Sequence, residues 1–150
     1  MNQTFAEILL FASVAMNAAV LTFMAGVLRK VTNDMDGPAF RHYLGSLYRH
    51  SVRSAFMLTL LGVPFVGAIP YFYFYGFGNR WIVAGLALWL AAGCIAKVIK
   101  VPIFNEVASL EGEDAAGLGW ARVRLNAGNL FQAVLNVVAA VLMAVSFIRR

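Results

Sequence analysis

Amide side chains recur along the last apolar stretch of the sequence, where they could orient a bound molecule by hydrogen bonding. Asn126, Asn129, Gln132 and Asn136 lie within roughly 120° of one another on a helix with 100° per residue. A polar group in hydrocarbon is costly, so this stripe is expected to face protein or a cavity. Asn17, in the first apolar stretch, lies at a similar depth to Asn136 and predicts a hydrogen bond with it. The stripe is interpreted either as helix–helix contacts or as the lining of a pocket for a largely apolar ligand.

Metal and nucleophile chemistry find little support in the sequence. Its two His and one Cys cannot supply a four-ligand zinc site of the usual kind. His42 and His50 lie two turns apart along one helix, too far to bind one ion together. Cys94 extends a line of small residues at helical spacing (Ala84, Ala87 and Ala91) that predicts a close helix contact. We therefore predict no metal site and assign no cofactor.

The elements that must position these groups are transmembrane helices. Hydrophobic residues make up 61% of the 150 residues and charged residues 13%, with a mean hydropathy of +0.76; these values exclude a disordered chain and an ordinary soluble enzyme. Four apolar runs are long enough to cross about 30 Å of hydrocarbon as helices: residues 5–28, 54–75, 81–100 and 125–148. The predicted fold is an all-α integral membrane four-helix bundle, with residues 1–150 as one transmembrane domain.

The distribution of positive charge predicts the orientation of the bundle. Nine of the twelve Lys and Arg residues lie in or beside the two long loops (29–53 and 97–124), whereas Arg80, Arg149 and Arg150 lie on the other side. Since cytoplasmic loops carry the excess of Lys and Arg, both long loops are predicted to be cytoplasmic and both termini periplasmic. We expect the membrane to be the bacterial inner membrane.

The first long loop contains a basic amphipathic segment at residues 39–53. Its apolar residues recur at helical spacing, while Arg41, Arg49 and Arg53 follow another face. Such a helix is expected to lie on anionic lipid, and because it leads directly into a membrane span, no nucleic-acid partner is predicted. The acidic residues of the second loop are expected to pair with these basic residues; they are Glu106, Glu111, Glu113 and Asp114.

Two features distinguish the second apolar run and the turn after it. Pro64 and Pro70 predict a kink or local unwinding of the helix. Aromatic residues crowd 71–81, which predicts a hairpin at the outer membrane interface, either as an anchor or as the mouth of a site for an apolar substrate.

Two segments resemble the anthrone-oxygenase-like family of small four-helix membrane proteins. Residues 97–110 read KVIKVPIFNEVASL, and residues 120–129 read WARVRLNAGN. Pro102, Asn105, Trp120 and Asn126 match the family pattern, whereas Asn129 stands where the family favours Arg. For some members the resemblance implies oxygenation of a polyketide anthrone. It also implies that Trp120, Asn126 and Asn129 orient the substrate.

Three functions follow from these patterns. The first is an accessory or scaffold subunit packing on a larger membrane complex, with membrane lipids and other membrane subunits or a second copy as partners. The alternatives are an anthrone-oxygenase-like membrane enzyme and a binder of an apolar ligand such as a quinone, pigment or lipid.

Overall fold

A computed structural model describes residues 2–110 and 114–149 of the chain, and the described residues contain helices and no strand. The helices are α1 (Gln3–Phe23), the π-helical turn η1 (Met24–Leu28), α2 (Arg29–Asp34), α3 (Gly37–Ser51), α4 (Ala55–Tyr75), α5 (Arg80–Ile95), the π-helical turn η2 (Ala96–Lys100), α6 (Val101–Ser109) and α7 (Ala115–Ile148).

Four continuous helices are long and apolar enough to cross a membrane, which confirms the predicted number. They are Gln3–Asp34, Ala55–Tyr75, Arg80–Ser109 and Ala115–Ile148. The second has 21 residues, or about 31 Å at 1.5 Å per residue, and matches the hydrocarbon thickness. The other three have 32, 30 and 34 residues and continue well beyond their apolar runs.

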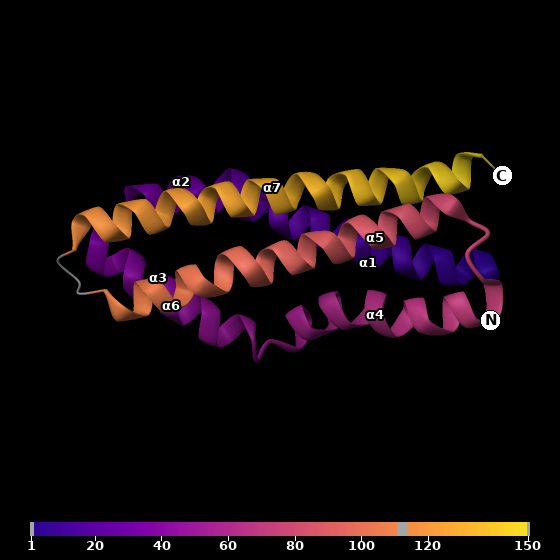
Figure 1. Cartoon of the computed structure of the whole chain (residues 1–150), viewed down its shortest axis with the longest axis horizontal. Coiled ribbons are helices and arrows are strands. Elements are labelled where there is room, and N and C mark those ends of the chain that lie inside the picture. Colours follow the sequence, from indigo (N-terminus) through magenta and orange to yellow (C-terminus); the bar gives the residue numbers. More distant parts are fainter. Residues whose placement is uncertain (1, 111–113, 150) are drawn as a thin grey trace.

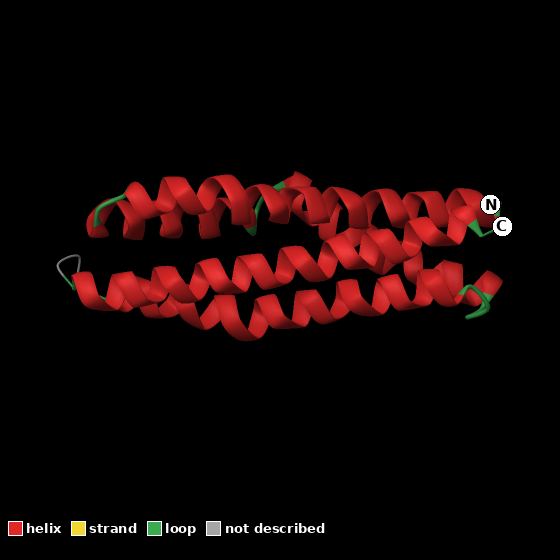
Figure 2. Cartoon of the chain, turned by 90° about the horizontal axis from the view of Figure 1, so that it is seen from above, coloured by secondary structure: helices red, strands yellow, loops and turns green. Residues whose placement is uncertain are grey.

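The helices form an antiparallel bundle with both termini at one end (Figures 1 and 2). We call this the terminal end; it also holds the α4–α5 turn. At the opposite, extended end lie the α2–α3 turn, the end of α6 and the start of α7. In the bundle α7 packs along α5 and α1, while α4 packs mainly on α1.

Two apolar clusters hold the bundle together, one toward each end. The cluster toward the terminal end contains Ala6, Leu10, Val14, Tyr71, Ile82, Leu86, Trp89, Ala139 and Met143. The cluster at the extended end contains Phe40, Leu44, Ile103, Val107, Leu118, Ala121 and Leu125. The second cluster shows that α3 packs its apolar face on α6 and α7 and prolongs the bundle beyond the spans.

The close contact of α5 with α7 depends on Gly85 rather than on the predicted small-residue line. A Cβ added at Gly85 would lie 2.3 Å from Met143 Cγ and 2.9 Å from the carbonyl oxygen of Ala139. In contrast, Ala91 and Cys94 are exposed, so the predicted small-residue line does not form the contact with α7. The face of α5 that meets α7 is therefore a different one.

The prolines of α4 do not unwind it. The helix runs unbroken through Pro64 and Pro70, so the expected local unwinding is absent. The departures from α-helical geometry occur instead in the first and third spans, as the π-helical turns η1 and η2. Such turns insert an extra residue into a helix and are frequent at functional sites.

Candidate functional site

The polar stripe of α7 lies inside the bundle at Asn129, Gln132 and Asn136, all of which are buried. Gln132 Oε1 accepts a hydrogen bond from Lys100 Nζ, and Asn136 Nδ2 donates to the carbonyl oxygen of Gln132 at 2.9 Å. The Oδ1 atoms of Asn129 and Asn136 are buried and have no hydrogen-bond partner within the described residues. This buried part of the stripe thus joins α7 to η2, and the amide oxygens of Asn129 and Asn136 can each accept a further hydrogen bond.

Lys100 is the member of this site that the sequence analysis missed. It was counted among the charges at the end of the third apolar run, but its ammonium group turns inward to Gln132. The residue ends the π-helical turn η2, whose altered register changes the direction in which the following side chains point. The sequence carries no signal for this inward position, because a Lys at the end of an apolar run usually extends to the membrane interface.

The part of the stripe nearer the extended end of the bundle connects α7 to the end of α2. Asn126 Nδ2 donates to Asn33 Oδ1 at 3.1 Å. One turn earlier, the Arg122 guanidinium donates to the carbonyl oxygens of Asn33 at 3.2 Å and Met35 at 2.9 Å. The same guanidinium lies 4.6 Å from the centre of the Phe40 ring. These contacts support the interpretation of this part as helix–helix contacts.

The structure does not bring all of the predicted site residues together. Trp120 is 63% exposed on the outside of α7, whereas Asn129 is buried nine residues later, about 13 Å along the helix. Asn17 is buried on α1, but no hydrogen bond joins it to Asn136 among the described residues. Trp120, Asn126 and Asn129 therefore line neither the groove between α3 and α6 nor the groove between the first span and α7.

A second polar cluster, at the terminal end, was not predicted as a site. The fully buried Glu7 accepts hydrogen bonds at Oε1 from the Tyr71 hydroxyl at 2.8 Å, from Gln3 Nε2 at 3.0 Å and from Asn79 Nδ2 at 3.1 Å. Asn79 also caps α5, since its Oδ1 accepts from the backbone amide of Ile82. Glu7 therefore fastens α1 to α4 and to the α4–α5 turn.

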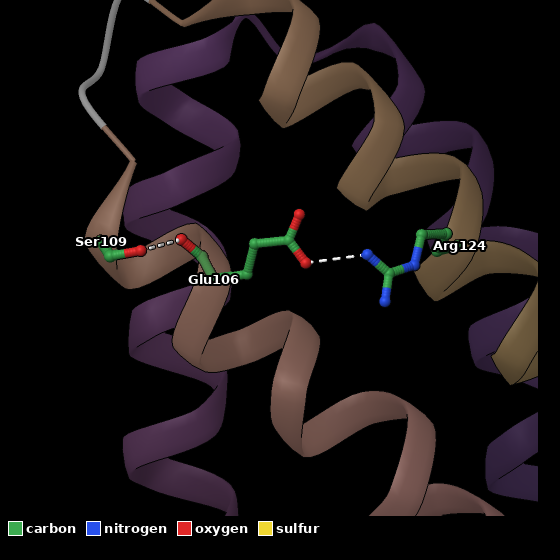
Figure 3. Close-up of polar contacts among 3 residues, drawn as sticks. All are labelled: Glu106, Ser109 and Arg124. Atoms are coloured by element: carbon green, nitrogen blue, oxygen red, sulfur yellow. Dashed lines mark hydrogen bonds and ion pairs between the residues drawn. The ribbon is translucent and has the colours of Figure 1, made fainter.

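The described acidic residues of the second loop, Glu106 and Asp114, form contacts on α6 and α7 rather than with the basic residues of the first loop. Figure 3 shows Glu106 of α6 extended toward Arg124 of α7, with an Oε2–Nη1 distance of 2.8 Å. The backbone carbonyl of Glu106 accepts from the Ser109 hydroxyl at 2.8 Å. Asp114 caps α7 by accepting from the backbone amide of Gly117. The predicted partner role of Glu111 and Glu113 lies outside the described residues.

The basic residues of α3 lie away from its buried apolar face. Arg41 Nη2 donates to the carbonyl oxygen of Ala108 on α6 at 3.0 Å, while Arg49 and, just after the helix, Arg53 are exposed. Because the apolar face packs on protein, contact with lipid headgroups stays a prediction for the exposed arginines alone. A groove of about 560 Å³ lies between α3 and α6.

A second groove, of about 320 Å³, opens on the side of the bundle between the first span and α7. Thr22, Ala25 and Gly26 form one wall, and the α7 residues Leu130, Ala133, Val134, Val137 and Val138 form the other. A Cβ added at Gly26 would meet no atom within 4 Å. Both grooves open outward, so neither encloses a ligand in the bundle interior.

Neither metal chemistry nor known relatives define the site further. Among the described residues, no group of three or more His, Cys, Asp and Glu side chains is placed to hold a metal ion, and His42 and His50 are exposed. Comparisons with protein-family models, curated proteins and solved structures found no match. The resemblance to anthrone-oxygenase-like proteins accordingly stays a prediction.

Proposed function

We propose that this protein is an accessory subunit that packs on a larger membrane complex and holds a transmembrane helix of a partner in the groove between its first span and α7. One observation supports the proposal: this groove opens outward from the bundle, and both of its walls are apolar. The bilayer is taken to be the bacterial inner membrane, with the extended end in the cytoplasm because most Lys and Arg residues lie there.

The walls of the groove suit helix association in lipid. Lipid tails are as apolar as Leu, so transmembrane helices associate through close packing at small residues rather than through the hydrophobic effect. Ala25 and Gly26 supply such a surface in η1, and Ala133 supplies it on α7. The π-helical turn η1 adds a bulge that interrupts the regular row of side chains. A partner helix can therefore approach the backbone closely.

The polar residues of α7 support the same proposal, because several of them already hold the bundle together. Gln132 accepts from Lys100, and Asn126 donates to Asn33. Groups committed to such contacts stabilise the scaffold by about 0.6–2 kcal/mol each. A scaffold tied internally in this way presents a fixed outer surface to a partner.

Filling the groove tests the proposal. Gly26→Leu places a side chain where an added Cβ meets no atom, so it should occupy the groove without disturbing the bundle. Gly62→Leu on α4 is the matched control, since that position is equally open within a span but lies outside the groove. After purification in a mild detergent, wild type and Gly62→Leu should retain a stoichiometric partner subunit or second copy. Gly26→Leu should lose it.

The same experiment separates a second candidate, a binder of an apolar ligand. The groove is almost wholly apolar and would also admit the tail of a quinone, pigment or lipid. A small molecule released from wild type and Gly62→Leu but absent from Gly26→Leu, with no partner protein in any sample, would replace the subunit proposal with this one.

A further inference from the structure

The groove between α3 and α6 has an apolar floor. Leu44 and Val107 are 1% and 2% exposed, and they meet beneath the groove. The rings of Tyr48 and Phe104 also line the groove, one from each helix, with centroids 5.0 Å apart and planes inclined at 31°. The packing of these four side chains fixes α3 on α6, so the groove belongs to the folded bundle.

Positive and hydrogen-bonding groups surround this floor. Arg41, His42 and Arg49 contribute from α3, and the Asn105 amide contributes from α6. No Asp or Glu is among the described residues that line the groove. Arg49 makes no hydrogen bond or ion pair within the described residues, so its guanidinium is available to an anion.

The nearest acidic side chain on α6 does not neutralise the groove. Glu106 follows Asn105 in the sequence but extends toward Arg124 of α7, as Figure 3 shows. The ion pair between them engages this carboxylate. The groove therefore keeps an excess of positive charge and is complementary to an anion.

Two independent helices place one end of the groove at the level of the lipid headgroups. If the 21 residues of α4 fill the hydrocarbon, its boundary lies near Ser54, and Arg49 lies on α3, five residues earlier and across the α3–α4 turn. The third span gives the same boundary, because a helix that starts at Arg80 covers about 30 Å when it reaches Lys100. Asn105 lies five residues further along this helix, about 8 Å beyond the boundary. The headgroup layer is about 5–8 Å thick on each side.

We propose that this groove binds the phosphate group of an anionic phospholipid between Arg49 and Asn105. The proposal does not depend on the subunit function, because it concerns α3 and α6 rather than the first span and α7. A guanidinium donates paired hydrogen bonds to phosphate oxygens, and the Asn105 amide adds a further donor. Tyr48 and Phe104 are amphipathic or apolar rings at the depth where such rings favour the interface. Arg41 extends the positive surface outward over the remainder of the headgroup, and His42 lines the groove beside it.

The test uses full-length, delipidated protein in a mild detergent, titrated with phosphatidylglycerol or phosphatidylcholine and examined by native mass spectrometry. Gly45→Leu fills the groove, because a Cβ added at Gly45 meets no atom within 4 Å. Gly119→Leu is the matched control on α7, where the position is equally open but does not line the groove. Arg49→Gln removes the charge without filling the groove.

Wild type and Gly119→Leu should bind one phosphatidylglycerol at least tenfold more tightly than phosphatidylcholine, a difference of about 1.4 kcal/mol. Gly45→Leu and Arg49→Gln should abolish this preference while keeping the helix content measured by circular dichroism. If Gly45→Leu fails to fold, Arg49→Gln decides. Equal affinity of wild type for the two lipids would overturn the proposal, as would an unchanged preference in Arg49→Gln. Competition by millimolar glycerol 3-phosphate distinguishes a lipid headgroup from a soluble phosphate ester. Complete displacement of the lipid would assign the groove to a soluble phosphate ester and overturn the lipid assignment.

Discussion

Replacing Glu7 with Leu should loosen the terminal end of the bundle. In the wild type, Oε1 of Glu7 accepts from the Tyr71 hydroxyl at 2.8 Å and from Asn79 Nδ2 at 3.1 Å, joining α1 to α4 and to the α4–α5 turn. Leu fills much of the same space but accepts no hydrogen bond. Since Tyr71 is only 1% exposed, its hydroxyl cannot turn to water for a replacement.

The number of donors that lose their acceptor sets the size of the effect. An unsatisfied buried donor costs about 1–3 kcal/mol, and hydrogen bonds within membranes fall at the lower end of the range. Gln3 is exposed and can turn to water, so the two remaining donors, from Tyr71 and Asn79, give an expected loss of about 2–4 kcal/mol for Glu7→Leu. Tyr71→Phe removes one donor and leaves the acceptor with others, so its expected loss is about 0.6–1.7 kcal/mol.

Unfolding by sodium dodecyl sulfate in mixed micelles, followed by circular dichroism, measures both losses. Ser13→Ala is the control on the same helix, because the Ser13 hydroxyl is exposed and bonds only to its own helix, at Leu9. Its free energy of unfolding should stay within about 0.5 kcal/mol of wild type. The reasoning is refuted if Glu7→Leu is as stable as Ser13→Ala, or if Tyr71→Phe loses more than Glu7→Leu.

Three further predictions follow from individual contacts. Gln132→Leu should lower the free energy of unfolding by about 1–3 kcal/mol, because it leaves the Lys100 ammonium without its acceptor. Adding Lys100→Met should restore most of the loss. Additive losses of the two substitutions in the same mixed-micelle assay would contradict the contact. Gly85→Ala should lower the free energy of unfolding by about 1–3 kcal/mol through overpacking against α7. Gly93→Ala on the same helix, where an added Cβ meets no atom within 4 Å, should be neutral or stabilising. Equal behaviour of the two variants in thermal unfolding would argue against the close approach of α5 to α7. A cysteine at Ser46 in an otherwise cysteine-free chain should be protected from an impermeant thiol reagent in intact cells, and labelling there would reverse the proposed orientation.

The sequence predicts the spans well because long apolar runs permit few alternatives. Lipid leaves no partner for unpaired backbone groups, so each run had to become a helix. The amphipathic segment at 39–53 also became a helix, α3. Its surroundings were harder to predict, because an apolar helix face gives the same pattern whether it lies on lipid or on protein. The cluster with Phe40 and Leu44 shows that protein covers it.

The contacts within the site depend on helix register, which periodicity alone does not show. Lys100 and Gln132 meet because η2 and α7 pass each other at that level, with a π-helical turn shifting one of them. Glu7 meets Tyr71 and Asn79 from 64 and 72 positions away. The position of the α5–α7 contact has a related cause. Most faces of α5 are apolar, so the small-residue line indicated a face that α7 does not cover.

Site-specific photo-crosslinking tests the central claim, that the groove between the first span and α7 holds a partner helix. A photoreactive amino acid replaces Val134 in the groove or, as the control, Val66, which is 70% exposed on α4. Illumination of intact membranes should give a discrete protein adduct of one added mass from position 134 and none from position 66. Lipid adducts alone at both positions would contradict the account.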